Sequence, residues 1–137
     1  MQVSKAEIQD AKDRFSKYKK TQAAANAAQK DLKNLLNEAE RLATKRRGPC
    51  YDEAMKRVEE AEKWAQGCNL AADEAKKEIM DAIDLLEDQE EKNVIYFKYV
   101  QGYSLEQTGL NMNMDPSTIK RRLGKAIIHI IEKRKSQ

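Results

Sequence analysis

The strongest constraint in this sequence is a regular spacing of small and apolar residues in its middle third. Between residues 54 and 86 they recur at alternating steps of four and three, which places them along one face of an α-helix. The positions are Ala54, Val58, Ala61, Ala65, Cys68, Ala72, Ala75, Ile79, Ala82 and Leu86. The segment is therefore predicted to be a long helix that buries one narrow face against a second helix.

The preceding segment is predicted to be that second helix. From Ser4 to Arg47 there is no Pro or Gly, and good helix formers dominate. The positions expected to face the partner helix, which we call the seam, fall in two sets. One set is Ile8, Phe15, Leu36 and Ala43, and the other is Ala11, Tyr18, Ala25, Leu32 and Ala39. Gln22 and Gln29 interrupt the seam. Since Pro cannot continue a helix, Gly48-Pro49 predicts a turn at 48–50. Residues 1–85 are therefore expected to form a long antiparallel helical hairpin, similar to a coiled coil.

Charge is distributed unevenly along the chain. Residues 1–50 hold 12 basic and 6 acidic side chains, residues 51–91 hold 5 and 14, and residues 115–137 hold 7 and 2. A basic first helix and an acidic second helix favour antiparallel pairing. The simplest explanation of the charges is that they solvate the two helices and pair them with each other. Trp64 lies off the seam, where it could pack on Met55, contact a neighbouring chain or anchor a partner protein.

Several classes of protein are disfavoured by what the sequence lacks. No stretch approaches the ~20 apolar residues of a membrane span, and no secretory signal is evident, so we expect a cytoplasmic protein with Cys50 and Cys68 as free thiols. There is one histidine, His129, and neither a Gly-rich phosphate loop nor a metal-binding motif. We expect no enzymatic activity, cofactor or metal, and a His129 side chain that points to solvent or to a DNA phosphate.

The last third of the chain predicts three short helices. Residues 93–100 form an apolar run that ends at Gln101-Gly102. Ser104 and Gln107 have the spacing of a capping box, so a helix is expected from Ser104 to about Asn111, followed by a turn at 112–114. Asp115 and Pro116 suit the start of a final helix that continues to about Lys133. The predicted fold is all-α, with a compact three-helix helix-turn-helix domain over residues 86–137.

The final helix has one face suited to packing and another suited to DNA. Its apolar positions are Ile119, Leu123, Ala126, Ile127 and Ile130. Its outer stripe, at steps of three and four, is Ser117, Lys120, Arg121 and Gly124.

Each residue of the outer stripe has a predicted contact with double-stranded DNA. Lys120 and Arg121 are the expected base readers, since Arg can make two parallel hydrogen bonds to guanine. Hydroxyl groups at a helix start suit a phosphate or a base edge, and these are Ser104, Ser117 and Thr118. Arg122 and Lys125 flank the stripe and are expected to contact phosphates. Gly124 would allow close approach of DNA, or it is an unoptimised surface position.

These residues carry a resemblance to a known domain. The matching segments are Val94-Ile95, Tyr99-Val100-Gln101-Gly102-Tyr103-Ser104 and Asp115-Pro116-Ser117-Thr118-Ile119-Lys120-Arg121-Arg122-Leu123. They resemble the fourth domain of bacterial sigma factors, which reads the upstream promoter element. Phage-encoded regulators of the ArpU and RinA type carry a similar module at the C-terminus of a short helical chain.

The resemblance implies a function and also has departures. It implies a sequence-specific transcriptional regulator of phage or prophage genes in a bacterial host cell, with host RNA polymerase as a candidate partner. Where the sigma pattern has Glu-Ile-Ala, this chain has Gln107-Thr108-Gly109, and Thr108 and Asn111 are polar where apolar residues are usual. No counterpart of the promoter-melting sigma domain is present, so a complete sigma factor is not expected.

The number of isoleucines on the final helix predicts a further contact. Ile127, Ile128, Ile130 and Ile131 exceed what one packing face of a small motif needs. We expect a homodimer that uses the hairpin and Ile128 or Ile131. Two alternative functions would use the same hairpin and helix-turn-helix. One is a DNA-packaging adaptor like the small subunit of phage terminases, and the other is an inhibitor whose hairpin binds a host protein while the tail regulates its own gene.

Overall fold

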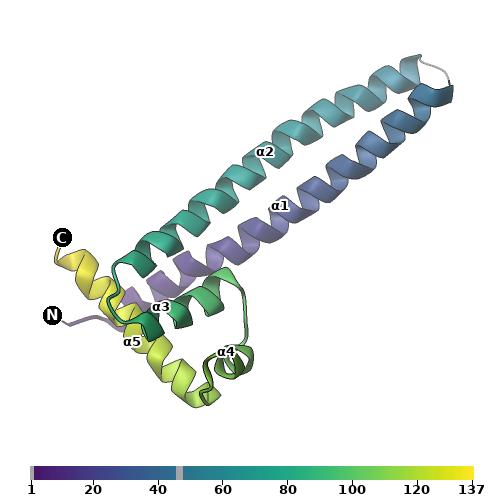
Figure 1. Cartoon of the computed structure of the whole chain (residues 1–137). Helices are drawn as coiled ribbons and strands as arrows, with labels where there is room; N and C mark the ends of the chain where they lie inside the picture. Colours follow the sequence, from purple (N-terminus) through teal and green to yellow (C-terminus); the bar gives the residue numbers. More distant parts are fainter. Residues whose placement is uncertain (1, 46–47) are drawn as a thin grey trace. The chain divides into compact units, whose positions relative to one another are not determined.

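The computed structural model describes residues 2–45 and 48–137, which form five α-helices and one short π-helix. They are α1 (Lys5–Lys45), α2 (Pro49–Asp84), α3 (Gln89–Ile95), the π-helix η1 (Tyr96–Val100), α4 (Leu105–Met112) and α5 (Pro116–Lys135). Figure 1 shows them in chain order. No strand occurs within these residues, which confirms the all-α prediction, and no helix there is long and apolar enough to cross a membrane.

The two long helices begin where their sequences favour it. Ser4 and Glu7 form a capping box at the start of α1, because the Glu7 N–H donates to Ser4 Oγ at 3.1 Å and the Ser4 N–H donates to Glu7 Oε1 at 3.3 Å. Pro49 is the first residue of α2, a position where its missing N–H costs no hydrogen bond. The predicted end of the first helix at Arg47 lies outside the described residues.

The chain divides into two compact units, and the division differs from the predicted boundary at residue 85. Unit 1 contains the start of α1 up to Lys19 and the whole chain from Glu74 onward, and unit 2 is Lys20–Asp73. The predicted boundary falls inside unit 1. The physical reason is that the core around α5 needs side chains from α1 and α2 in addition to those of residues 86–137.

Unit 2 consists of the remaining lengths of α1 and α2, which run antiparallel in Figure 1. Its buried side chains are small: Ala25, Ala28, Ala39, Ala54, Val58, Ala65 and Ala72. Along α2, every predicted seam position from Ala54 to Ala72 is buried or half-buried. Trp64 is 70% exposed, so Met55 and its other neighbours leave most of its surface in solvent.

The α1 seam departs from the prediction after Ala25. The predicted positions Gln29 and Leu36 are exposed, Leu36 by 43%, whereas Ala28 is buried and Leu35 is packed against the core. The seam therefore steps by three from Ala25 to Ala28, where a strict heptad requires four. A step of this kind overwinds the helix pair locally, and here it keeps the Gln29 amide in water and turns an alanine inward.

Unit 1 has a core of large aliphatic and aromatic side chains. Phe15 from α1 and Ile79 from α2 are fully buried in one cluster with Ile95, Ile119, Ile127 and Ile130. The rings of Phe15 and Tyr99 lie 5.3 Å apart, centre to centre. Ile131 is buried in this cluster and Ile128 is half-buried, so of the two predicted contacts with a second chain, Ile128 or Ile131, only Ile128 keeps substantial exposed surface. The apolar side chains of α5 lie in this cluster with side chains of α1, α2, α3 and α4.

The segment before α4 is longer and less regular than the predicted helix over 93–100. α3 begins at Gln89, and Asp88 caps it by accepting a hydrogen bond from the Glu90 N–H. The last turn is the π-helix η1, and the chain leaves it through Gly102 at φ +71°, a left-handed conformation that glycine adopts at low cost. The predicted Gly stop is confirmed.

Candidate nucleic-acid interface

The predicted turn between residues 111 and 115 is built by a glycine and an asparagine. α4 ends at Met112, and Asn113 takes the left-handed conformation with φ 55°. The Met114 N–H donates to the Gly109 carbonyl at 2.9 Å. A Cβ atom at Gly109 would lie 2.4 Å from the Met114 carbonyl oxygen. Glycine is therefore required at the position where the sigma-like pattern has alanine.

The start of α4 matches the sequence prediction in detail. The Gln107 N–H donates to Ser104 Oγ, and the Ser104 N–H donates to Gln107 Oε1, so both bonds of the capping box form. Thr108 is fully buried, and its hydroxyl donates to the Ser104 carbonyl at 2.9 Å. Asn111 is exposed. The two polar residues that depart from the sigma-like pattern therefore fit this helix without an unpaired polar atom.

α5 presents its predicted outer stripe to solvent. Ser117, Lys120, Arg121 and Lys125 are exposed, and Thr118 and Gly124 are half-buried. Asp115 occupies the predicted N-cap position, but its side chain makes no capping hydrogen bond. Ser104, at the start of α4, is also exposed. A Cβ atom at Gly124 would meet nothing within 4 Å, so no packing within the described residues requires glycine there.

Arg122 has a different environment from the predicted one. Its guanidinium forms an ion pair with Glu90 of α3, and the residue is half-buried. Its Nε atom is buried and has no hydrogen-bond partner among the described residues. Arg122 therefore makes a structural contact between α3 and α5 that the sequence analysis missed, and its contact with a DNA phosphate stays a prediction.

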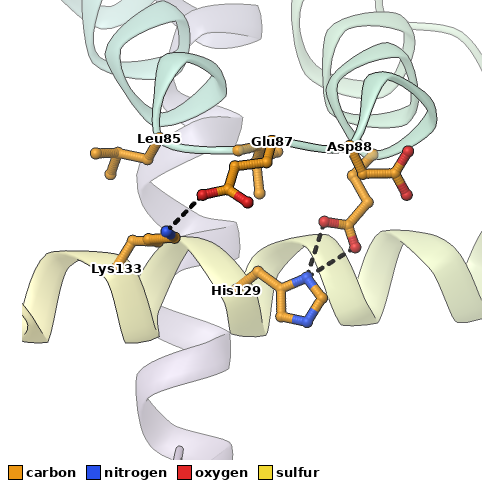
Figure 2. A pocket seen from close by; sticks show the side chains of 7 residues that line it. Leu85, Glu87, Asp88, His129 and Lys133 are labelled. Atoms are coloured by element: carbon orange, nitrogen blue, oxygen red, sulfur yellow. Dashed lines mark hydrogen bonds and ion pairs between the residues drawn. The ribbon is translucent and has the colours of Figure 1, made fainter.

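His129 also makes a contact that the sequence analysis missed. Its Nδ1 atom lies 2.8 Å from both carboxylate oxygens of Glu91, which is itself buried. Figure 2 shows the ring on α5 turned toward this carboxylate, beside a shallow pocket that Leu85, Glu87, Asp88 and Lys133 also line. His129 therefore contacts α3 through Nδ1, and it is also exposed, as the expectation that it points to solvent had it.

The missed contacts follow one pattern. Arg122, His129 and Lys133 lie along one edge of α5, and their partners are Glu90, Glu91 and Glu87. The cluster of acidic residues over 87–91 was visible in the sequence. The steps of seven and four along α5 place the three basic residues on one flank of its buried face, which was the signal that could have paired them.

The basic side chains of α5 fall into two groups. Lys133 pairs with Glu87 at 3.0 Å, Lys135 pairs with Glu7 at 2.7 Å, and the Arg134 guanidinium lies 6.0 Å from the centre of the Phe15 ring. The ion pair with Lys135 lowers the pKa of Glu7. Lys120, Arg121 and Lys125 make no ion pair with any residue in 2–45 or 48–137. The first half of α5 thus carries the cationic groups left available to a ligand.

The residues that could bind a metal ion are not grouped. Within the part of the chain that the structure describes, no three His, Cys, Asp or Glu side chains lie together so that they could hold one. Cys50 is exposed, Cys68 is half-buried in the α2 seam, and both are free thiols.

Comparisons with protein-family models, with curated proteins and with solved structures find no match for this chain.

Proposed function

We propose that this protein is a sequence-specific, double-stranded DNA-binding regulator of transcription, in which α4 and α5 act as a helix-turn-helix. The observation that carries the proposal is the division of charge along α5. Along one edge and in its second half, Arg122, Lys133 and Lys135 pair with Glu90, Glu87 and Glu7, whereas Lys120, Arg121 and Lys125 are left without an acidic partner among the described residues.

This division favours an anionic ligand over a purely structural role. A surface lysine or arginine gains little from an ion pair in water, so unpaired cations are tolerated anywhere. Here, however, three of them share the exposed side of the first half of a helix whose other Lys and Arg side chains contact a carboxylate or, for Arg134, the Phe15 ring. A helix of this kind, exposed at its N-terminal end and preceded by a tight turn, has the form that enters the major groove of DNA.

The proposed roles follow from position along α5. Arg121 and Lys120 reach base edges, and Lys125, one turn further on, contacts a phosphate. Ser117 and Thr118 lie in the first turn, where backbone N–H groups and hydroxyls bind phosphate or a base edge. Ser104 Oγ accepts the capping bond from Gln107, which leaves its hydroxyl hydrogen free to donate to a phosphate at the start of α4.

The wider proposal follows the sequence resemblance. Residues 86–137 serve as a sigma domain-4-like reading module, and residues 1–85 serve as a coiled-coil-like hairpin that presents it. The chain is then a phage or prophage regulator of the ArpU and RinA type, a binding protein in the host cytoplasm, with RNA polymerase as a candidate partner. The departures at Thr108 and Gly109 fit this module because the Thr108 hydroxyl is hydrogen-bonded within α4 and the close approach of Met114 leaves no room for a Cβ atom at Gly109.

The test is a binding experiment with the full chain. Duplexes enriched from a random library, together with one of scrambled sequence, are titrated by fluorescence anisotropy between 50 and 200 mM salt. We expect selective binding that weakens steeply with salt, since each phosphate contact releases bound counterions. Arg121→Ala is expected to cost about 1–3 kcal/mol and to relax selectivity at one base pair. Equal binding of enriched and scrambled duplexes by the wild type would contradict the proposal.

A matched pair of lysines on the same helix provides the control. Lys125→Ala removes an unpaired charge and is expected to reduce the salt slope by about one. Lys133→Ala removes the same charge, but from a side chain that is paired with Glu87, and it is expected to leave the slope unchanged. If the two variants lose the same slope, binding responds only to net charge, and the first half of α5 is not the DNA surface.

A further inference from the structure

Two facing segments of unit 2 lack charge in a chain whose residues are 36% charged. Residues 21–29 of α1 and residues 64–72 of α2 contain no Asp, Glu, Lys or Arg. The two segments begin at similar distances from the connection between the helices, Gln29 lying sixteen residues before Lys45 and Trp64 fifteen residues after Pro49. In an antiparallel pair they lie at the same height. We call them the uncharged belt.

Alanines of the belt form the seam between the two helices. Ala25 and Ala28 of α1 and Ala65 and Ala72 of α2 are buried. Only one side of each helix is used in this way, and the other sides of the belt are open to solvent. The absence of charge on those open sides is therefore not explained by packing within the chain.

The open sides expose apolar side chains of two sizes. Trp64 is 70% exposed and Leu70 is 61% exposed. Near them are small exposed residues, Ala23, Ala24 and Ala27 on α1 and Gly67 and Ala71 on α2. Trp64, Gly67 and Ala71 are separated by steps of three and four, so they share one face of α2. A large indole thus lies beside small residues on which another indole could pack, and exposed tryptophan is typical of interface anchors.

We propose that the uncharged belt is the interface between two copies of this chain. In this dimer α1 of each copy lies beside α2 of the other, and Trp64 of each copy packs on small exposed residues of the other copy's belt. A two-fold interface uses the same patch on both partners, which requires a patch that contains both a large side chain and small residues on which it can pack. The belt meets this requirement, because it exposes Trp64 on α2 and small residues on both helices.

The charges that flank the belt also suit a second copy. Within unit 2, residues 20–45 of α1 hold five basic and three acidic side chains, and residues 49–73 of α2 hold three and six. A two-fold pair that places α1 of one copy beside α2 of the other brings opposite net charges together. Nucleic acid does not suit this surface, since the belt offers no cation to a phosphate. The proposal does not rest on DNA binding.

The first test uses the protein's single tryptophan as its own probe. Full-length protein without DNA is diluted from high micromolar to nanomolar concentration, and its mass is measured by sedimentation equilibrium alongside Trp64 emission. We expect a dimer at high concentration, with emission that shifts to longer wavelength as the mass falls to that of one chain. A monomer at every concentration, with emission typical of exposed indole, would overturn the proposal and assign the belt to a different protein partner.

The second test places a charge in the belt. Ala71→Glu changes an exposed residue to a good helix former, and Ala6→Glu makes the same change at an exposed position outside unit 2. Burying an unpaired carboxylate in the interface is expected to raise the dimer Kd on the order of a hundredfold or more, while Ala6→Glu keeps the wild-type Kd. Circular dichroism checks that both variants remain helical. Equal dimer Kd values for the two variants would place the interface elsewhere.

Discussion

Unit 1 and unit 2 are built from the same two long helices but have very different cores. In unit 1 the fully buried side chains include Phe15, Ile79, Ile95 and Ile127. In unit 2 the largest fully buried side chain is Val58, and the remaining buried positions are alanines. Since the free energy of burial scales with apolar area at roughly 25 cal/mol per Å², the stability of this chain is concentrated in unit 1.

The difference suits the two proposed roles of this helix pair. Large side chains from the start of α1 and the end of α2 lie in one core with α3, α4 and α5, and the proposed base-reading surface would require such a fixed arrangement. Small side chains along unit 2 hold the pair together with little burial, and they leave Trp64 and Leu70 in solvent. Unit 2 is therefore the part of the chain whose stability would increase most on binding a partner.

The largest effect is expected from Phe15→Ala. Phe15 belongs to α1 but is fully buried in the core of unit 1 against Tyr99. Its loss should lower the free energy of unfolding by about 3–5 kcal/mol, measured by urea denaturation and circular dichroism. Leu36→Ala, at a 43% exposed position in unit 2, is the control and should cost much less. The comparison between the units fails if the two variants are equally stable, or if residues 86–137 alone fold as stably as the full chain.

The next largest effect is expected from Gly109→Ala. The added methyl group would lie 2.4 Å from the Met114 carbonyl oxygen, which is backbone and cannot rotate away. Overpacking of this kind costs about 1–3 kcal/mol, here in the free energy of unfolding of unit 1. The neighbouring variant Leu110→Ala, at a residue 82% exposed, should change stability little. A Gly109→Ala protein as stable as the wild type would mean that the turn before α5 is looser than the close contact indicates.

The sequence predicted the elements of both units better than it predicted the contacts between elements. The capping box at Ser104, the glycine stop at Gly102 and the α2 seam all depend on local spacing, and each is confirmed. The roles of Arg122 and His129 depended on which flank of α5 faces α3, and spacing within one helix does not determine that. The shift from Leu36 to Leu35 was missed because a strict seven-residue repeat was assumed over several turns.

A smaller effect, specific to unit 1, is expected at high pH. Burial raises the pKa of Tyr99 from 10.0 to about 12, because the charged phenolate is disfavoured in the core. The stability from the neutral hydroxyl is fully present below pH 10 and is lost as the pH rises toward 12, since only the unfolded chain ionises readily in this window. Tyr99→Phe should flatten the fall in the urea midpoint over that range, and Tyr103→Phe should retain it. An unchanged decline in Tyr99→Phe would assign the effect to other groups.

The smallest change in stability, and the sharpest separation of the units, is expected from a pair of glycines. Gly124 in α5 and Gly67 in α2 both lie within helices, and a Cβ atom at either would meet nothing within 4 Å. Alanine at each position should therefore stabilise the fold by up to about 1 kcal/mol, measured by urea denaturation. Only Gly124→Ala places a methyl group on the surface proposed to enter the DNA groove, so it should raise the DNA Kd while it raises stability. If Gly124→Ala gains stability and keeps the wild-type DNA Kd, Gly124 is an unoptimised surface position and α5 does not approach DNA closely there.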